Sequence, residues 1–185
     1  MLQAADPELV ERIKNGDKAA FSELAGRYAG PLFGLAYALV GNAADAEDVV
    51  QEAMLAALKK MHTFEGRSSV GTWLRSVVVF QASKTRRSRR VRTALPLHDH
   101  EDLASSANSR PGAGSGAQAV DSRVDAMAML DTLSPEHRAI VVLRELQQMS
   151  YEEISKTMGV PLGTVESRLY RARQELRQRF SGYGS

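Results

Sequence analysis

Residues 149–176 read MSYEEISKTMGVPLGTVESRLYRARQEL and contain two helical patterns separated by a Gly-Val-Pro break. The first pattern opens with Ser150 and carries Glu153 three residues later. This is the spacing of a capping box, in which each side chain binds the other residue's backbone amide. Gly159 is expected to end the first helix, and the second begins after Pro161. The stretch therefore predicts two helices joined by a short turn.

The second helix of this pair separates apolar from polar residues. The apolar side, expected to be core, carries Leu162, Val165, Leu169, Ala172 and Leu176. At about 100° per residue the opposite side carries Gly163, Ser167, Tyr170, Arg171 and Gln174, flanked by Thr164 and Glu166. Small polar residues near the N-terminus, followed by an arginine, suit a helix that enters the major groove of DNA. The alternative is a helical hairpin with a solvated, charged outer face.

The residues on the N-terminal side of this hairpin complete a small helical domain, predicted over residues 121–185. Val124, Met127, Ala128 and Leu130 predict a first helix. Ser134 and Pro135 supply a cap and a first-turn proline for the next one, which carries Ile140, Leu143 and Leu146. Together with the hairpin, these patterns predict a helix-turn-helix domain.

The N-terminal half, residues 1–94, also shows helical periodicity. Asp17 is expected to cap a first helix that carries Ala20, Phe21, Leu24 and Tyr28. Gly30-Pro31 is expected to end this helix. The next helix is expected to carry Leu32, Leu35, Ala36 and Leu39 and to end at Gly41-Asn42. A third helix, from near Asp45, carries Ala46, Val49, Ala53, Ala57 and Met61, and a fourth runs from Val70 through Trp73, Leu74, Val77 and Val78. No stretch alternates with a period of two, so the predicted fold class is all-α with two small helical domains.

Charge is distributed unevenly along the chain, although the formal net charge is only +2. Residues 84–92 read KTRRSRRVR, with six basic residues in nine, and a second basic cluster contains Arg168, Arg171, Arg173, Arg177 and Arg179. Acidic residues at Asp45, Asp48 and Glu52 fall on one face of the third helix. Two basic patches indicate two contacts with a polyanion. Each charge run also has the simpler interpretation of a solvated helix face.

Between the two halves, residues 95–120 are rich in Gly, Ser and Ala and are expected to form a flexible linker. Fully extended, a segment of this length reaches ~85 Å. His98 and His100 in this segment are interpreted as solvated, and no metal is expected. A linker of this reach would let two domains bind separated sites on one DNA molecule.

The composition excludes several classes of protein. The chain has 185 residues and no cysteine, which excludes a disulfide scaffold, a thiolate zinc site and a cysteine nucleophile. The longest apolar run is interrupted by Gly30, Pro31 and Gly34 and is too short to span a membrane. We find no Gly-rich phosphate loop or nucleophile elbow. A cytoplasmic protein that is not an enzyme and needs no cofactor is expected.

In several motifs the sequence resembles bacterial RNA polymerase sigma factors of the extracytoplasmic-function (ECF) group. LSPEHRAIVVLREL, SYEEI and GVPLGTVESRLYRAR resemble sigma region four, whereas DAEDVVQE, FEGRSSVGTWL and the basic tract resemble region two. The resemblance implies a transcription initiation factor that binds core RNA polymerase, directs it to promoters, helps to open them and is controlled by an anti-sigma factor. It implies no membrane insertion of this chain.

The resemblance also implies roles for particular residues. Core polymerase, through the β′ clamp helices, would be bound by Asp45, Asp48, Gln51 and Glu52. The promoter −10 element would be bound by Trp73, Lys84, Arg86, Arg87, Arg89 and Arg90, although Trp73 also suits a core position. The −35 element would be bound by Gly163, Thr164, Glu166, Ser167, Arg168, Tyr170 and Arg171, while the same domain packs on the β flap.

Three positions depart from the family pattern. Phe80 and Lys84 stand where an Asn and an Asp are common, and Glu166 stands where a basic residue is frequent. A glutamate favours cytosine in direct base contact. Two alternatives to a promoter-directing factor are therefore kept: a sigma-like decoy that sequesters an anti-sigma protein, and a stand-alone helix-turn-helix regulator.

Overall fold

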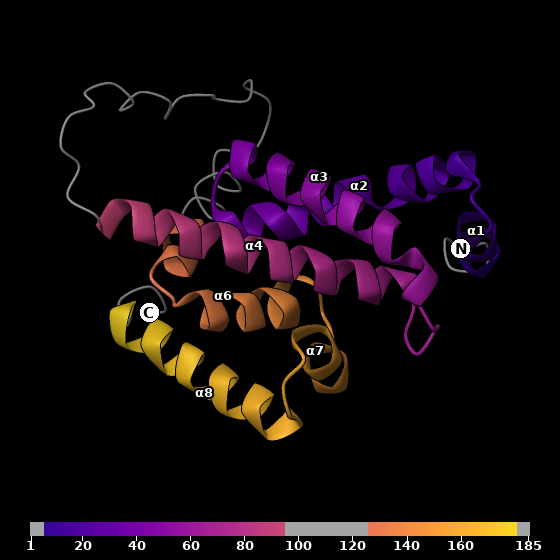
Figure 1. The fold of residues 1–185 in the computed structure, drawn as a ribbon. Coiled ribbons are helices and arrows are strands. Elements are labelled where there is room, and N and C mark those ends of the chain that lie inside the picture. The colour runs from indigo at the N-terminus through magenta and orange to yellow at the C-terminus, as the bar shows by residue number, and fades with distance from the viewer. Residues whose placement is uncertain (1–5, 95–125, 181–185) are drawn as a thin grey trace, which may run out of the picture.

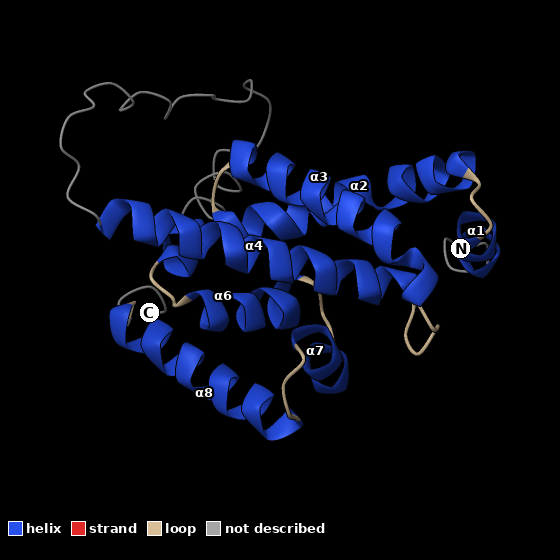
Figure 2. Ribbon diagram, in the orientation of Figure 1, coloured by secondary structure: helices blue, strands red, loops and turns tan. Residues whose placement is uncertain are grey.

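The computed structural model describes residues 6–94 and 126–180, and every regular element in those ranges is helical, so the predicted all-α fold is confirmed (Figure 2). The N-terminal body contains α1 (Asp6–Lys14), α2 (Lys18–Val40), α3 (Ala43–Lys60), the 3₁₀ turn η1 (Met61–Thr63) and α4 (Val70–Ala94). The C-terminal body contains a short helix over 126–131, α6 (Pro135–Val141), the π-helical turn η2 (Val142–Leu146), α7 (Tyr151–Met158) and α8 (Leu162–Arg179). The predicted linker and His98-Asp99-His100 lie outside the described residues.

Helix ends in the N-terminal body lie where the sequence places its capping residues. The Asp17 carboxylate accepts the backbone amides of Ala19 and Ala20 at 2.8 and 3.1 Å. Gly41 ends α2 in the left-handed conformation at φ 91°, and Asn42 then caps α3 by accepting the Asp45 amide. The third helix accordingly begins at Ala43, two residues before the predicted start.

The predicted break at Gly30-Pro31 is wrong, because α2 runs without interruption from Lys18 to Val40 with Pro31 inside it. An interior proline costs a helix about 3 kcal/mol, since it removes one amide donor and crowds the preceding turn. Here Pro31 itself is exposed, whereas Leu24 before it and Leu32 and Leu35 after it are fully buried. Burial of apolar side chains on both sides of the proline therefore offsets its local cost.

The core of this body lies where α2, α3 and α4 pack against one another (Figure 1). The predicted inner face of α3 is confirmed: Ala46, Val49, Ala53 and Ala57 are all buried, and Met61 follows them into the core. Three of these four helical residues are alanines, so neighbouring helix backbones can approach closely. The opposite face of α3 consequently remains at the surface.

A close contact between α2 and α4 positions the start of α4. The Tyr28 hydroxyl donates to the buried Asp6 carboxylate at 2.5 Å, and its ring lies over Gly71. A Cβ atom at Gly71 would lie 2.8 Å from Tyr28 Cε1, closer than packed atoms tolerate. Burial, followed by the hydrogen bond to Asp6, raises the pKa of Tyr28 to about 12. Residue 71 must therefore be a glycine, because a Cβ atom at this position would collide with the ring of Tyr28.

In the C-terminal body the predicted caps are confirmed, and the core position predicted for Leu162 is wrong. Ser150 and Glu153 form the reciprocal capping box, and Gly159 ends α7 at φ 64°. Leu146 is 57% exposed, because the chain changes from α- to π-helical hydrogen bonding at η2 and no longer follows a 3.6-residue period. Leu162 is 41% exposed because it is the first residue of α8, beyond the edge of the packed stripe formed by Val165, Leu169 and Ala172.

The two bodies pack against each other, with α4 lying across α6 and α7 (Figure 1). Arg138 of α6 is fully buried; its Nε donates to the Ala38 carbonyl at 2.6 Å, and its guanidinium also pairs with Asp131. Arg86 of α4 donates to the next carbonyl, Leu39, at 2.9 Å. Two arginines thus bind the C-terminal carbonyls of α2, where the helix dipole favours cations.

Candidate protein and nucleic-acid interfaces

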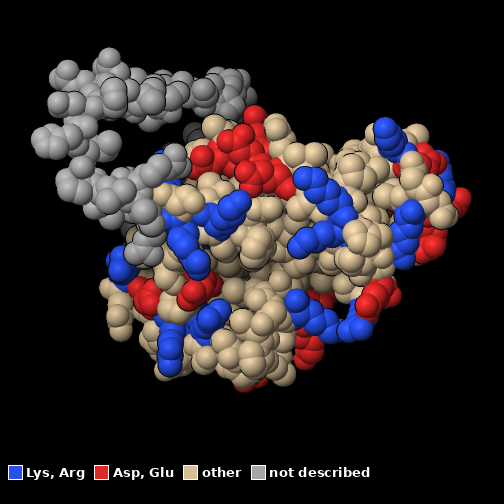
Figure 3. Space-filling model, in the orientation of Figure 1, with Lys and Arg blue, Asp and Glu red and all other residues tan. Residues whose placement is uncertain are grey.

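The outer face of α3 is an acidic surface. Asp48, Gln51 and Glu52 are exposed, and acidic side chains gather over the N-terminal half of this helix (Figure 3). Asp45 differs from them, because it is half-buried and its carboxylate accepts hydrogen bonds from Asn42 and Arg89 at 2.8 and 3.1 Å. The predicted polymerase-binding set therefore contains three available side chains and one that is held within the fold.

Two leucines that the sequence analysis did not assign extend this acidic surface. Leu55 and Leu58 of α3 are 59% and 43% exposed. Leu55 is one turn beyond Gln51 and Glu52 on the same face of the helix. Charged residues next to exposed apolar residues are typical of a protein–protein interface. The i, i+4, i+7 spacing of Gln51, Leu55 and Leu58 was the sequence signal for this extension.

In the basic tract at the end of α4, some arginines bind groups within the protein, whereas other cations are exposed to solvent. Arg86 donates to the Leu39 carbonyl, and Arg89 forms an ion pair with Asp45 at 3.1 Å. Lys84 and Arg87 are exposed. The side chain of Arg90 lies outside the part of the chain that the structure describes. Of the predicted −10 residues, Lys84 and Arg87 are thus the cations that are both described and available to a ligand.

The aromatic residue predicted for the −10 site is packed into the fold, and a different one is exposed. The Trp73 ring is half-buried and lies against Phe64, with ring centroids 5.2 Å apart and planes at 46°. Phe80, two turns further along α4, is 69% exposed. Trp73 therefore has the packing of a core residue, while Phe80 presents its ring to solvent.

The outer face of α8 presents most of the predicted −35 residues. Gly163, Glu166, Ser167, Tyr170 and Arg171 are exposed, and Thr164 is half-buried. Arg168 turns toward α6 and lies 4.0 Å from Glu136. Arg173 pairs with Glu145 at 2.7 Å, and this hydrogen bond raises the pKa of Arg173. The leading end of the face is small and polar, with Arg171 following, as a helix that approaches base edges requires.

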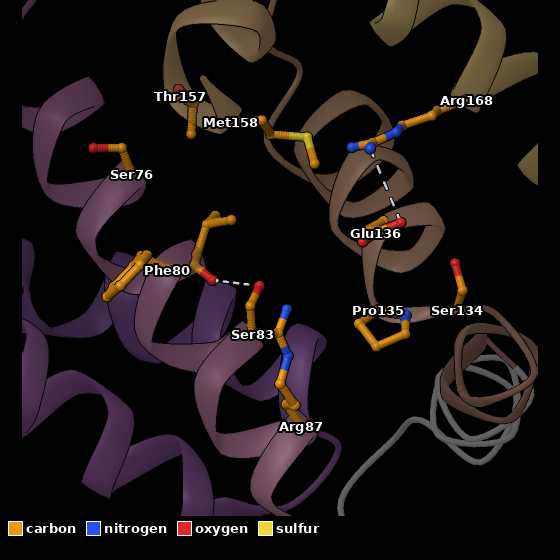
Figure 4. Close-up of a pocket in the computed structure, with 11 residues that line it drawn as sticks. Ser76, Phe80, Ser83, Arg87, Ser134, Pro135, Glu136, Thr157, Met158 and Arg168 are labelled. Atoms are coloured by element: carbon orange, nitrogen blue, oxygen red, sulfur yellow. Dashed lines mark hydrogen bonds and ion pairs between the residues drawn. The ribbon is translucent and has the colours of Figure 1, made fainter. Parts of the chain in front are cut away.

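A cleft of about 750 Å³ lies at the junction between α4 and the C-terminal body. Its α4 wall contains Phe80, Ser83 and Arg87, and the opposite wall contains Glu136, Met158 and Arg168, with Arg168 extending toward Glu136 (Figure 4). The candidate −10 helix and the candidate −35 helix therefore contribute residues to one cleft in this arrangement.

The described residues contain no group of three or more His, Cys, Asp or Glu side chains that is suited to hold a metal ion. Across the same ranges, 6–94 and 126–180, no helix is long and apolar enough to cross a membrane.

Comparison with known families matches both bodies. Residues 24–92 match the family described as Sigma-70 region 2, and residues 123–176 match Sigma-70, region 4. In this order, with an intervening segment, the two matches define a sigma-70-type architecture.

Curated relatives extend the similarity over nearly the whole chain. The ECF RNA polymerase sigma-E factor of Haemophilus influenzae is 34% identical over 184 residues, covering 93% of each chain. The ECF RNA polymerase sigma-E factor of Escherichia coli K12 is 33% identical over 187 residues, covering 94% of this chain and 93% of the relative. The ECF sigma factor SigE of Mycolicibacterium smegmatis is 37% identical, and the match covers 92% of this chain but 66% of the longer relative.

Two solved structures share the arrangement of the helices. CnrH, solved in complex with the cytosolic domain of CnrY, superposes with a TM-score of 0.70 at 23% identity over 98% of this chain and 99% of that chain. RpoE of Bartonella quintana, solved with the anti-sigma factor NepR, gives a TM-score of 0.64 at 26% identity over 88% of this chain and 97% of that chain. The first of these shows the fold alone.

Taken together, the two region matches and the full-length similarity show that the chain belongs to the ECF RNA polymerase sigma factors. It is a transcription initiation factor that directs RNA polymerase to promoters. The alternative of a stand-alone helix-turn-helix regulator is overturned by the region-two match over residues 24–92.

Proposed function

We propose that the three exposed faces divide the work of promoter recognition among them. The α3 face binds the β′ clamp helices of core RNA polymerase, α4 handles the −10 element, and α8 reads the −35 element while its domain packs on the β flap. The observation that carries this proposal is the separation of charge: Asp48, Gln51 and Glu52 are exposed on α3, whereas Arg171 is exposed on α8. The protein acts without a cofactor in the cytoplasm and catalyses no covalent step.

The polymerase contact is tested by reversing one charge on the α3 face. Asp48→Arg should weaken binding to core polymerase by at least about 10-fold, because it places a cation where the proposal requires an anion. Binding of the purified variant to core enzyme is measured by fluorescence anisotropy, with circular dichroism as the check on folding. Glu8→Arg, which reverses an exposed acidic residue on α1, is the matched control and should bind normally. Unchanged affinity of Asp48→Arg would remove α3 from the interface.

Contact with both promoter elements requires the two bodies to separate. The elements are ~25 base pairs apart, which is ~85 Å along the duplex at ~3.4 Å per base pair. A compact chain of 185 residues has a radius of gyration of only ~16 Å. Arg87 of α4 and Arg168 of α8 also line the same cleft. The arrangement with α4 against α6 and α7 is therefore a resting state, and the promoter-bound protein is extended.

A regulatory partner is part of the proposal. RpoE of Bartonella quintana, which shares this fold, was solved with an anti-sigma factor bound. We propose that this chain is likewise held inactive by an anti-sigma factor. Co-purification of tagged protein from the native cell, followed by transcription assays with the recovered partner, tests this. A partner that leaves transcription unchanged would remove the regulatory assignment while leaving promoter recognition in place.

A further inference from the structure

Arg138 of α6 has the largest fully buried side chain among the described residues. An arginine is almost never fully buried unless its charge is paired. Here the guanidinium pairs with Asp131, whose side chain is 59% exposed, and Nε donates to the Ala38 carbonyl at 2.6 Å. Asp131 belongs to the same body as Arg138, whereas Ala38 belongs to α2 of the other body. The burial of this charge therefore depends on the packing of the two bodies.

The acceptor of Arg138 lies at the C-terminal end of α2, where the last carbonyls have no partner within the helix. The next carbonyl, that of Leu39, accepts a hydrogen bond from Arg86 of the same body, and this bond does not depend on the position of the C-terminal body. The Ala38 carbonyl accepts its hydrogen bond from the other body. Separation of the bodies would thus break the Arg138 bond, keep the Arg86 bond and expose the Arg138 guanidinium to water.

The contact that Arg138 makes is incomplete. Its Nη2 atom is buried and has no hydrogen-bond partner within residues 6–94 and 126–180. A buried donor without a partner has lost its water without replacement, so this atom favours separation, whereas the bond to Ala38 favours packing. The hydrogen bond between Arg75 and Gln147, which also crosses between the bodies, is long at 3.4 Å. These opposing effects leave a contact that can be released.

We infer that Arg138, with Asp131 as its counter-ion, is an autoinhibitory latch that holds the C-terminal body against the end of α2. The inference rests on the proposal that the packed arrangement is a resting state. A latched molecule cannot place α4 and α8 on both promoter elements at once. Because only separated molecules are competent, the apparent promoter affinity is reduced by the fraction of molecules that are separated. The latch thus restrains the free protein, and the strength of one buried contact sets how strongly.

The test measures the populations of packed and separated molecules in the full-length chain, without polymerase or DNA. The chain has no cysteine of its own, so nitroxide labels can be placed at Ser88→Cys of α4 and Gln178→Cys of α8, both exposed positions. Pulsed electron paramagnetic resonance then gives the distribution of distances between them. Arg138→Ala should raise the ratio of separated to packed molecules by about 10- to 150-fold, the range for a hydrogen bond to a charged group. Asp131→Asn should raise it by a smaller factor, because the amide accepts a hydrogen bond but carries no charge.

Two comparisons show whether the effect belongs to the latch. Glu145→Gln, which removes the partner of Arg173 within the C-terminal body, is the matched control and should leave the ratio unchanged. In the Arg138→Ala background, Asp131→Asn should have no further effect, because both substitutions act through the same guanidinium. Circular dichroism checks the folding of every variant. Should Arg138→Ala fail to fold, Asp131→Asn still decides the question, because its side chain is exposed.

The remaining outcomes overturn the latch in distinguishable ways. If the folded variants keep the wild-type ratio, the latch is wrong while the resting state stands. If Asp131→Asn separates the bodies equally well in the Arg138→Ala background, the two residues do not act together and the latch is wrong. If the wild type is itself mostly separated, the resting state in the proposed function is wrong, and the latch with it.

Discussion

The two arginine-rich helices, α4 and α8, use their cations differently. In α4, Arg86 and Arg89 bind groups on α2 and α3, and Lys84 and Arg87 remain exposed. In α8, Arg168 and Arg173 turn toward acidic residues of their own body, and Arg171 is exposed on the opposite side. In each helix one part of the basic cluster holds the fold together and another part faces solvent.

The difference between the helices lies in what surrounds the exposed cations. Those of α4 follow an exposed aromatic ring, Phe80, which lies near the middle of a long helix packed into a bundle. Arg171 of α8 follows Gly163 and Ser167, small residues that leave room for close approach. The first arrangement suits an unpaired strand, and the second suits the groove of a duplex. Basic charge alone would not distinguish these two ligands.

The largest effect on promoter affinity is expected when the bodies that carry α4 and α8 are prevented from separating. Arg75 Nε and Gln147 Oε1 lie 3.4 Å apart across the contact between the bodies, and the chain has no cysteine of its own. In Arg75→Cys/Gln147→Cys, a short bismaleimide should link the bodies. Because the linked protein can use only one helix at a time, promoter affinity should fall by about 100-fold or more. Electrophoretic mobility shift with core polymerase measures the change.

The same double-cysteine protein without the cross-linker is the control, and it should bind normally. If the cross-linked protein binds the promoter as tightly as this control, the bodies need not separate. That result would overturn the description of the packed arrangement as a resting state.

A smaller effect on DNA binding is expected from substitutions in α8, where an exposed arginine and one held in an ion pair should behave differently. Arg171 forms no ion pair with any described residue, whereas Arg173 is bound to Glu145. Arg171→Ala should cost ~1–3 kcal/mol in −35 binding if it contacts a base. Arg173→Ala should leave DNA binding unchanged and cost at most ~1 kcal/mol of stability, as expected for a partly exposed ion pair. Fluorescence anisotropy on cognate and scrambled −35 duplexes measures both variants. Equal losses of Arg171→Ala on the two duplexes would identify a phosphate contact instead.

Local features of the fold could be predicted from the sequence because their causes are local. Asp17, Ser134 and Ser150 each accept an amide two or three residues away, so the helix starts could be read from short patterns. The buried face of α3 follows equally from the spacing of its apolar residues. The exposure of Leu146 could not be predicted in this way, because the spacing of the apolar residues gives no sign of the π-helical turn at η2.

The availability of each site residue could not be predicted, because its partners are distant in the sequence. Arg86 binds a carbonyl 47 residues away, and Arg173 binds a carboxylate 28 residues away. In the sequence these residues are indistinguishable from their exposed neighbours. Phe80 shows the converse: the sequence marks it only as a departure from the family pattern, and its exposure appears once α4 is packed.

The smallest expected effect on DNA binding, with a clear effect on stability, comes from two glycines at equivalent positions. Gly71 and Gly163 are each the second residue of their helices, α4 and α8. A Cβ at Gly71 meets the Tyr28 ring at 2.8 Å, whereas none of the described atoms lies within 4 Å of a Cβ at Gly163. Gly71→Ala should therefore destabilise the protein by ~1–3 kcal/mol through overpacking. Gly163→Ala should leave stability unchanged or raise it by up to ~1 kcal/mol, because alanine favours the helix.

Urea unfolding measures both glycine variants, and the titration of Tyr28 identifies the cause. Burial is the main reason that the pKa of Tyr28 is raised to about 12. Displacement of the ring by the Gly71→Ala methyl group exposes the hydroxyl, so this pKa should fall toward the ordinary tyrosine value of about 10. Absorbance at the tyrosinate band should then lose its latest-titrating component, which Tyr28→Phe identifies independently. If Gly71→Ala is destabilised while that component persists, the strain is relieved by movement of α4 rather than of Tyr28, and −10 binding should weaken in the same variant.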